Sequence, residues 1–430
     1  MPFRLDTRAA DFSNQFRNFL NAKREAAADV DAAVRIIIAD IVARGDRALT
    51  ELTQRFDRLD LHAIGMRISR EEIDGASARC DGVALEALTL ARDRIESHHR
   101  RQLPSDDRYT DALGVEIGHR WTAVEAVGLY VPGGTAAYPS SVLMNAVPAK
   151  VAGVPRMVMV VPSPDGQLSP LVLAAAKLAG VDEIYRIGGA QAVAALAYGT
   201  ETIKPVAKIV GPGNAYVAAA KRQVFGMVGI DMIAGPSEVL IVADAEGNPE
   251  WIAADLLAQA EHDSAAQSIL ITNDAALAQA VEAALERQLK TLPRNAITAA
   301  AWRDHGATIL VRDFEEAVLL IDALAPEHLE IALRDPEPLA ARIRNAGAIF
   351  IGHHTPEAIG DYVAGSNHVL PTARSARFSS GLGVLDFMKR TSLLKLGPES
   401  LRALGPAAIA LGRAEGLEAH ARSVAIRLNL

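Results

Sequence analysis

Cysteine and aromatic residues are the scarcest components of this sequence. Its 430 residues include a single cysteine, Cys80, so one chain can form neither a disulfide framework nor a thiolate zinc site. Any zinc ion would need histidine, carboxylate or amide ligands instead. Aromatic residues make up 5% of the chain, whereas alanine, valine, leucine and isoleucine are abundant, and this mix favours helices layered on buried parallel strands.

Positive charge is not in excess, and long apolar runs are missing. The formal net charge is -8 at pH 7, which argues against a nucleic-acid partner. No run approaches the length of about 18 apolar residues that a membrane span needs, so we expect no membrane partner. The first residues lack an apolar signal core, so we expect a cytoplasmic protein. A chain of 430 residues with 50% hydrophobic content predicts two or more well-packed domains.

Three widespread enzyme motifs are also absent. The sequence contains neither the dinucleotide fingerprint G-x-G-x-x-G nor the phosphate-binding motif G-x-x-x-x-G-K-[ST]. It does not contain the zinc-protease motif H-E-x-x-H either, which counts against a metal-dependent hydrolase. Any nucleotide site must therefore be formed by other features of the chain.

Short apolar runs alternate with helical runs along much of the chain. The alternation begins near Val124 and restarts after Gly235-Pro236. Such alternation is typical of parallel α/β sheets. We predict an α/β protein with two Rossmann-like parallel-sheet domains, an N-terminal helical region and a C-terminal helical tail. The predicted parts are a helical arm (residues 1–24), a first α/β domain (25–125 plus 236–380), a second α/β domain (126–235) and the tail (381–430).

Glycine turns follow three of the predicted strands and precede helices. They are Pro132-Gly133-Gly134, Gly188-Gly189 and Gly211-Pro212-Gly213. Glycine lets the backbone approach a ligand closely, and helix N-termini favour phosphate. Turns on successive strands would line one edge of the sheet, where α/β proteins bind ligands. Each turn taken alone is more typical of an ordinary strand-to-helix connection.

Two polar motifs have residue types suited to metal binding and to acid–base chemistry. Gln259 and His262 are three residues apart and share one face of a predicted helix end. Imidazole is a good zinc ligand and an amide oxygen a tolerated one, although a solvated helix end explains this motif equally well. Glu327 and His328 follow a proline and can serve as an acid–base pair. The alternative is a charged helix start at Pro326.

Two further polar segments lie near the end of the chain. Residues 360–368 place aspartate, tyrosine, serine, asparagine and histidine in one glycine-bounded loop, and polar loops on a rigid sheet commonly hold sites. The alternative for this segment is a solvated surface loop. Residues 415–420, in the tail, contain two glutamates and a histidine, a pattern that an exposed amphipathic helix would also explain.

Taken together and in this order, the motifs resemble the histidinol dehydrogenase family. The similarity extends from about Val127 to His420, whereas the first 125 or so residues add little. The matching blocks are Gly128-Leu-Tyr130-Val-Pro-Gly-Gly, Gly188-Gly-Ala-Gln191-Ala, Gly211-Pro-Gly-Asn214-Ala-Tyr, Ala234-Gly-Pro-Ser237-Glu, Gln259-Ala-Glu-His262-Asp, Ala325-Pro-Glu327-His328-Leu and Gly360-Asp361-Tyr-Val-Ala-Gly-Ser-Asn-His368.

The resemblance implies a role for each matching residue. The zinc ligands would be Gln259, His262, Asp361 and His420. The catalytic pair would be Glu327 and His328. The substrate would contact Ser237, Gln259, His262, His328, Asp361, His368, Glu415 and His420. The second α/β domain would contact NAD through Tyr130, Gln191 and Asn214. The resemblance also implies a homodimer whose tails cross over, so that each tail completes the partner's site.

The implied reaction is the zinc-dependent oxidation of L-histidinol to L-histidine through L-histidinal, with two NAD, as the last two steps of histidine biosynthesis. Zinc could polarise the reacting oxygen or only orient the substrate. A close alternative is a relative that oxidises another small alcohol, such as a sulfonated diol. A zinc hydrolase and a zinc-bridged scaffold without activity are more distant alternatives.

Overall fold

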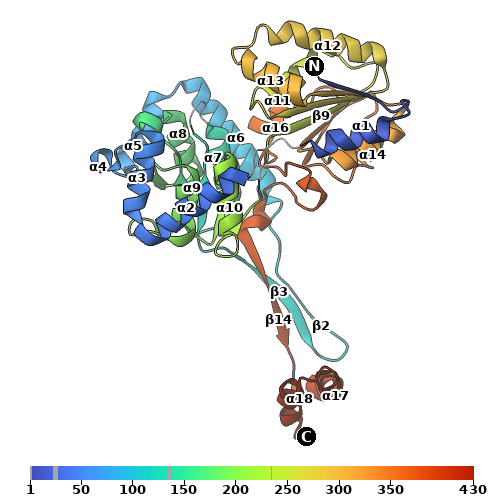
Figure 1. The fold of residues 1–430 in the computed structure, drawn as a ribbon. Helices are drawn as coiled ribbons and strands as arrows, with labels where there is room; N and C mark the ends of the chain where they lie inside the picture. Colours follow the sequence, from blue (N-terminus) through green and yellow to red (C-terminus); the bar gives the residue numbers. More distant parts are fainter. Residues whose placement is uncertain (1, 23–27, 134–137, 234) are drawn as a thin grey trace.

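The protein consists of two lobes and a slender stalk (Figure 1). The computed structural model describes residues 2–22, 28–133, 138–233 and 235–430. Among these residues, no helix is both long and apolar enough to cross a membrane. We refer to the six-stranded lobe and the five-stranded lobe by the sheets at their centres.

The six-stranded lobe contains a sheet in which all neighbouring strands are parallel. The strand order is β1 (Phe3–Asp6), β11 (Ala307–Leu310), β10 (Gln267–Thr272), β9 (Glu238–Ala243), β12 (His328–Ala332) and β13 (Ala348–Ile351). One face packs against α1 (Phe12–Asn21), α14 (Phe314–Leu324) and α15 (Glu337–Ala340). The other packs against α11 (Pro249–Ala260), α12 (Ala275–Leu289) and α13 (Asn295–His305), with α16 (Glu357–Tyr362) beside α11.

The five-stranded lobe also contains a parallel sheet. The strand order is β6 (Glu183–Tyr185), β5 (Met157–Val160), β4 (Val127–Tyr130), β7 (Lys208–Val210) and β8 (Gly229–Ile230). One face packs against α2 (Ala28–Arg44), α3 (Asp46–Asp57), α9 (Gly189–Tyr198) and α10 (Ala215–Val224), with α4 (Leu61–Ile64) beside α3. The other packs against α5 (Arg70–Ala76), α6 (Gly82–Arg100), α7 (Pro139–Val151) and α8 (Pro170–Ala179).

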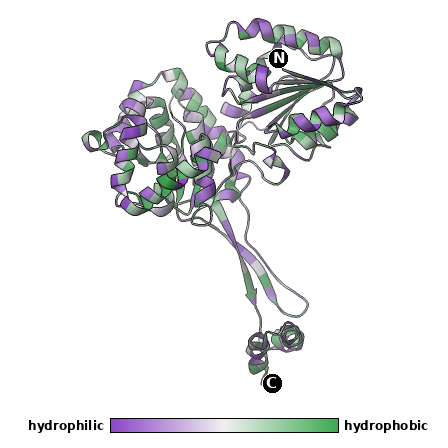
Figure 2. Ribbon diagram, in the orientation of Figure 1, coloured by the Kyte–Doolittle hydropathy of each residue, from purple (hydrophilic) through white to green (hydrophobic). Residues whose placement is uncertain are grey.

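The alternation of side chains along each strand decides which helices it meets. Because successive residues of a strand point to opposite faces, Leu329 and Ile331 of β12 join the α14 core, and Ala332 joins the α11 core. Both faces of each sheet are covered, so the central strands are apolar over most of their length, as Figure 2 shows for the six-stranded lobe. Helices with one apolar face can cover such a sheet from both sides.

The stalk is a three-stranded antiparallel sheet that carries the C-terminal helices away from both lobes (Figure 1). Its strands, in order, are β14 (Met388–Lys395), β3 (Glu116–Ala123) and β2 (Asp107–Thr110). At its end, α17 (Pro398–Ala414) packs against α18 (Glu418–Ala425) around a small core that contains Ile409 and Ala421.

The predicted fold class is confirmed, but the predicted grouping of segments needs correction. Residues 25–125 were grouped with 236–380, whereas α2 packs against α9 and α10, and α6 packs against α7. Helices of this region therefore cover the five-stranded sheet. Conversely, the arm at residues 1–24 begins with a strand that pairs with β11 of the six-stranded sheet. Long-range packing decides this grouping, and helical periodicity in a sequence does not identify the sheet that a helix covers.

Two local predictions were also wrong. Part of the tail at 381–430, predicted as helical, is strand β14, because pairing with β3 supplies backbone partners that a helix would find internally. The helix start that we considered at Pro326 does not form. Residues 328–332 instead fill a place in the sheet between β9 and β13, where two apolar residues alternate with polar ones.

Candidate active site

A large cleft lies between the two lobes, with a volume of about 1410 Å³. Its lining includes Tyr130 and Gly211 from the carboxyl ends of β4 and β7, and Ser237 and His328 from the amino ends of β9 and β12. Opposite ends of the two parallel sheets therefore face each other. The predicted glycine turns all contribute to one side of this cleft, except that Gly134 lies outside the described residues.

His328 is the first residue of β12, and its imidazole is buried and held in one orientation. Its Nδ1 donates to the backbone carbonyl of Glu238 at 3.0 Å, so Nδ1 carries the proton of the neutral ring. Its buried Nε2 has no hydrogen-bond partner among the described residues and lies 3.8 Å from Asp361 Oδ1. Burial lowers the pKa of His328 to about 3. The free Nε2 can therefore accept a proton.

Glu327 precedes His328 and is fixed by the same residue of β9. The backbone N–H of Glu238 donates to Glu327 Oε2 at 2.9 Å, while the carbonyl of Glu238 accepts from His328. The parallel register that pairs His328 with Val239 places one residue of β9 between the two side chains. Glu327 Oε2 lies 3.7 Å from His328 Nδ1. The backbone of a single residue, Glu238, thus orients the acid–base pair that the sequence predicted.

The end of α11 brings Gln259 and His262 to the same place. Asn248 caps the start of this helix by accepting from Glu250 N at 2.9 Å, and Pro249 occupies its first turn, so the sequence determines where the helix begins. The helix ends at Ala260, which leaves Gln259 in its last turn and His262 just beyond. Gln259 Nε2 and His262 Nδ1 lie 2.9 Å apart. Desolvation in the cleft lowers the pKa of His262.

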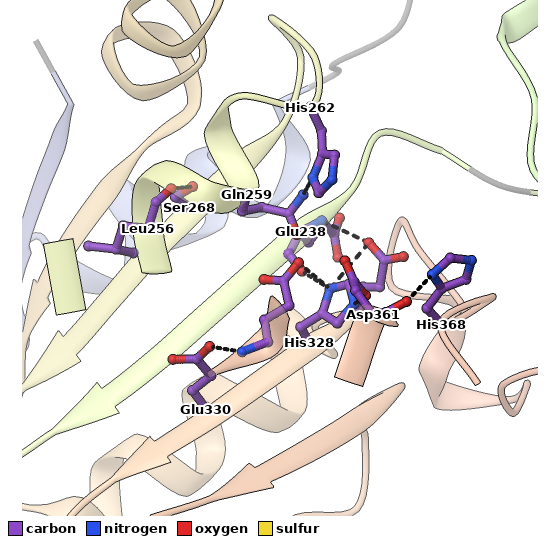
Figure 3. A network of polar contacts seen from close by, with 11 residues as sticks. Glu238, Leu256, Gln259, His262, Ser268, His328, Glu330, Asp361 and His368 are labelled. Atoms are coloured by element: carbon purple, nitrogen blue, oxygen red, sulfur yellow. Dashed lines mark hydrogen bonds and ion pairs between the residues drawn. The ribbon is translucent and has the colours of Figure 1, made fainter. Parts of the chain in front are cut away.

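Asp361 and His368 approach from the other side, on α16 and the loop that follows it (Figure 3). Burial raises the pKa of Asp361 to about 7. His368 Nδ1 donates to the backbone carbonyl of Asp361 at 3.1 Å, and burial lowers the pKa of His368 to about 4. Ser237 lines the cleft beside them. The structure therefore brings together the predicted substrate and metal residues of the six-stranded lobe.

These side chains form a set of donors that fits a metal ion. Ligand atoms of His328, Glu357 and Asp361 all lie within 4.8 Å of one another. The buried amide oxygen Oε1 of Gln259 has no hydrogen-bond partner in the part of the chain that the structure describes. A buried polar atom without a partner is costly, and a cation would satisfy it. Imidazole, carboxylate and amide oxygen together suit Zn²⁺, and Gln259 and Asp361 are the two predicted ligands among these residues.

The cofactor residues predicted from the sequence lie on the opposite side of the cleft. Tyr130, Gln191 and Asn214 all contribute to its lining. The hydroxyl oxygen of Tyr130 accepts from the backbone N–H of Gly189 at 3.0 Å. Asn214 caps α10 by accepting from the backbone N–H groups of its first turn. Tyr130 and Asn214 thus hold a glycine turn and a helix start in place. This side of the cleft therefore offers backbone groups to a ligand as well as side chains.

A buried ion pair, which the sequence analysis did not predict, supports the third glycine turn. Lys221 and Asp231 form a salt bridge with both side chains almost fully buried. Lys221 Nζ donates to the carbonyl of Gly211 at 2.9 Å, and the N–H of Gly211 donates to Asp231 Oδ2 at 2.8 Å. Gly211 has a φ of 111°, and a Cβ there would lie 2.2 Å from the carbonyl oxygen of Tyr130. Only glycine fits this turn.

The two predicted site residues of the tail lie elsewhere in this chain. Glu415 follows α17 and His420 belongs to α18, and both are exposed. They do not line the cleft, and the stalk holds their helices apart from both lobes (Figure 1). A single chain thus brings Gln259, His262 and Asp361 together without His420.

Three acidic residues near the site were missed in the sequence. Glu238 lies at the start of β9, Glu330 in the middle of β12 and Glu357 at the start of α16, and all three are buried. Burial and the nearby Asp361 raise the pKa of Glu357 well above its ordinary value. For Glu330, the sequence contains one signal, a charged residue in the middle of an apolar strand. Buried carboxylates are rare unless they have partners, so such a residue is a candidate for a role at a site.

The comparisons with known proteins agree with this arrangement. The sequence model of the family described as histidinol dehydrogenase matches residues 20–428. A relative named histidinol dehydrogenase from Bradyrhizobium diazoefficiens is 71% identical over 430 residues, and one from Nitrobacter winogradskyi is 73% identical over 429, with 100% of each chain covered in both cases. The crystal structure of histidinol dehydrogenase from Elizabethkingia anophelis has a TM-score of 0.94 and 35% identity, over 100% of this chain and 98% of that one.

A two-lobed α/β fold with glycine turns on one side of its cleft and an acid–base pair on the other defines an NAD-dependent dehydrogenase. The relatives identify the kind more closely. The chain belongs to the histidinol dehydrogenase family, since the family match covers nearly its whole length and the curated relatives share over two thirds of its residues.

Proposed function

We propose that the protein oxidises L-histidinol to L-histidine through L-histidinal, with zinc bound at the site and two NAD consumed per substrate. The observation that carries this proposal is the free Nε2 of His328. It is a base fixed through its own Nδ1–H, and it lies 3.8 Å from Oδ1 of Asp361, one of the proposed metal ligands. The name shared by relatives that cover the whole chain supports the choice of substrate.

In the first oxidation, His328 accepts the hydroxyl proton through Nε2 while hydride leaves the carbinol carbon. The side of the cleft that Tyr130 and the glycine turns form would hold NAD, which would serve as the hydride acceptor when bound. The hydrogen bond to the Glu238 carbonyl strengthens as His328 becomes positively charged, because a charged donor makes a stronger hydrogen bond. The register of β12 on β9, which sets this hydrogen bond, therefore stabilises the protonated imidazole as it forms.

In the second oxidation, Glu327 accepts a proton from a water molecule that adds to the aldehyde, while the protonated His328 returns its proton to the aldehyde oxygen. His328 then accepts a hydroxyl proton of the resulting hydrate as the second hydride leaves for a second NAD. The N–H of Glu238 donates to Glu327 Oε2 and so holds the carboxylate in the orientation in which it would accept a proton from water. A positioned acid or base of this kind typically contributes a factor of ~10²–10⁴ in rate. Glu327 should therefore matter more for the aldehyde step than for the alcohol step.

Gln259, His262 and Asp361 would hold the zinc ion, and the fourth ligand would be His420 of a second copy. When bound, zinc would orient the amino and imidazole nitrogens of the substrate. The tail lies at the end of an exposed stalk, which allows it to reach a neighbouring chain (Figure 1). We therefore propose a homodimer with shared sites, in which Glu415 of each chain also faces the partner's substrate. His368 would bind the substrate imidazole from beside Asp361.

Two measurements on the purified protein test this function. NADH formation is followed with L-histidinol and, separately, with a sulfonated diol, before and after removal of metal by a chelator. We expect two NADH per histidinol, loss of activity without metal and recovery with added zinc. Faster turnover of the diol would assign the chain to a different substrate within the same family. Full activity of the metal-free protein would reject the zinc site.

A further inference from the structure

The residues that face the cleft from the six-stranded lobe stand on a second layer of acidic side chains. Residues four apart on a helix, or two apart on a strand, share one face. Three elements of the lobe thus each carry a site residue and, one step deeper on the same face, a carboxyl group. The pairs are Gln259 with Asp255 on α11, His328 with Glu330 on β12, and Asp361 with Glu357 on α16.

Glu330 occupies a position that the sheet would otherwise give to an apolar residue. It lies opposite Ile241 of β9 and Phe350 of β13, and it is only 4% exposed. Its side chain is on the α11 face, since its neighbours Leu329 and Ile331 join the opposite core. A carboxyl group buried at such a position is costly unless it is hydrogen-bonded.

The hydrogen bonds of Glu330 link the three elements. Its Oε1 accepts from the backbone N–H of Glu357 at 2.6 Å, which fixes the start of α16 (Figure 3). Its carboxyl group also makes a side-chain hydrogen bond with Asp255 of α11. Two carboxyl groups can hydrogen-bond to each other only if one of them carries a proton. The pair therefore shares one proton.

Glu357 completes the layer directly beneath the catalytic pair. Its Oε1 lies 3.6 Å from His328 Nδ1, and its backbone is held by Glu330. α16 has only six residues, of which Glu357 and Gly360 are buried, so its own backbone hydrogen bonds give it little rigidity. Besides the close packing of Gly360 against Phe350 of β13, the contact with Glu330 ties the element that carries Asp361 to the sheet that carries His328.

We propose that Glu330, with Asp255 as its partner, is a positioning residue that holds α11 and α16 at the separation at which Gln259, His262 and Asp361 bind the same metal ion. This inference rests on the proposed function, because it assigns a purpose to the geometry of the proposed zinc site. Residues that orient metal ligands typically change metal affinity about 10- to 100-fold when they are replaced.

The test compares zinc binding by three metal-free proteins: the unaltered chain, Glu330→Leu and Glu330→Gln. Leucine fills the space without accepting from Glu357 N or donating to Asp255. Glutamine keeps both contacts, since its amide oxygen accepts and its NH₂ group donates. We expect zinc affinity, measured against a competing chelator, to fall about 10- to 100-fold in Glu330→Leu and to stay within about threefold in Glu330→Gln.

A matched control separates positioning from loss of stability. Thr308 is also buried, in strand β11, and its Oγ1 donates to Glu282 of α12 at 3.1 Å, so this contact involves neither α11 nor α16. Thr308→Val should lower the melting temperature but leave zinc affinity unchanged. At saturating zinc, Glu330→Leu should regain much of its kcat, because added metal compensates for weak binding.

The zinc affinities distinguish failure of the positioning role from failure of the proposed zinc site. If the unaltered chain binds zinc and Glu330→Leu binds it equally well, the positioning role is wrong and the proposed function stands. If the unaltered chain does not bind zinc, the proposed site fails together with this inference. Should Glu330→Leu fail to fold, Asp255→Leu is measured instead, because Asp255 is half-buried and its loss removes the same link. Unchanged zinc affinity in that variant would also overturn the proposal.

Discussion

The two sides of the cleft are built from the same strand and helix units but present different groups to it. The six-stranded lobe presents side chains from the amino ends of its strands, and buried atoms such as Gln259 Oε1 and His328 Nε2 have no hydrogen-bond partner among the described residues. The five-stranded lobe presents glycine turns from the carboxyl ends of its strands, and there Tyr130 and Asn214 are hydrogen-bonded to backbone.

This difference indicates what each side can bind. Buried groups without partners favour a ligand that supplies what they lack, such as a cation, an exchangeable proton or a polar substrate. Glycine turns at helix starts favour a ligand that needs close approach and backbone donors, which suits a dinucleotide. We therefore propose that the chemistry takes place on one lobe and that the other lobe binds the group that receives the electrons.

The largest expected effect comes from breaking the acid–base pair. His328→Asn should lower kcat about 10²–10⁴-fold with both L-histidinol and L-histidinal, because the base acts in both oxidations. Glu327→Gln should lower turnover of histidinal much more than single-turnover oxidation of histidinol. Stopped-flow NADH formation with each substrate measures both rates. Equal losses in the two steps for Glu327→Gln would remove its proposed role.

The next effect concerns the ion pair beneath the cofactor side. Lys221→Met leaves Asp231 buried without its partner, which typically destabilises a protein by about 3–5 kcal/mol. It also releases the Gly211 carbonyl, so the KM for NAD should rise while zinc affinity stays the same. Denaturant unfolding and NAD titrations measure the two effects. Altered zinc affinity in this variant would show that the two sides are not independent.

Metal removal should separate the two sides without any mutation. We expect chelation to increase amide hydrogen exchange at the end of α11 and in α16, since the ligands there lose their common partner. The glycine turns after β4, β6 and β7 should exchange as before. Hydrogen-exchange mass spectrometry with and without zinc makes this comparison. If hydrogen exchange at the glycine turns rose as much as exchange in α16, the metal would affect both lobes, which would contradict separate roles for them.

The smallest effect is expected at Tyr130. Tyr130→Phe removes one acceptor for the Gly189 N–H and should cost about 0.5–1.5 kcal/mol, a typical value for one hydrogen bond. The KM for NAD should rise severalfold at unchanged kcat, because the hydroxyl group shapes a turn and takes no part in proton transfer. Steady-state kinetics at varied NAD checks this. A large fall in kcat would instead place the hydroxyl group in the reaction.

The sequence predicted the parallel α/β class and the residues that meet in the cleft, because motifs after strands report local structure and family resemblance supplies their roles. It could not assign α2 and α6 to the five-stranded sheet, since an amphipathic helix does not encode its distant neighbour. It also missed Glu330 and Glu357. The local sequence does not distinguish a carboxyl group buried beneath a site from one in solvent. The distinction requires the register of β12 in the sheet and the position of α16 against it.

The central claim is that each site combines a catalytic lobe from one chain with the tail of another. It is tested by mixing His420→Ala with Glu327→Gln, each inactive alone, after reversible dissociation. If tails are exchanged, a mixed dimer contains one intact site, and random pairing should restore about a quarter of the original activity. If each chain serves its own site, no intact site forms, and activity that stays at background in verified mixed dimers would contradict the account.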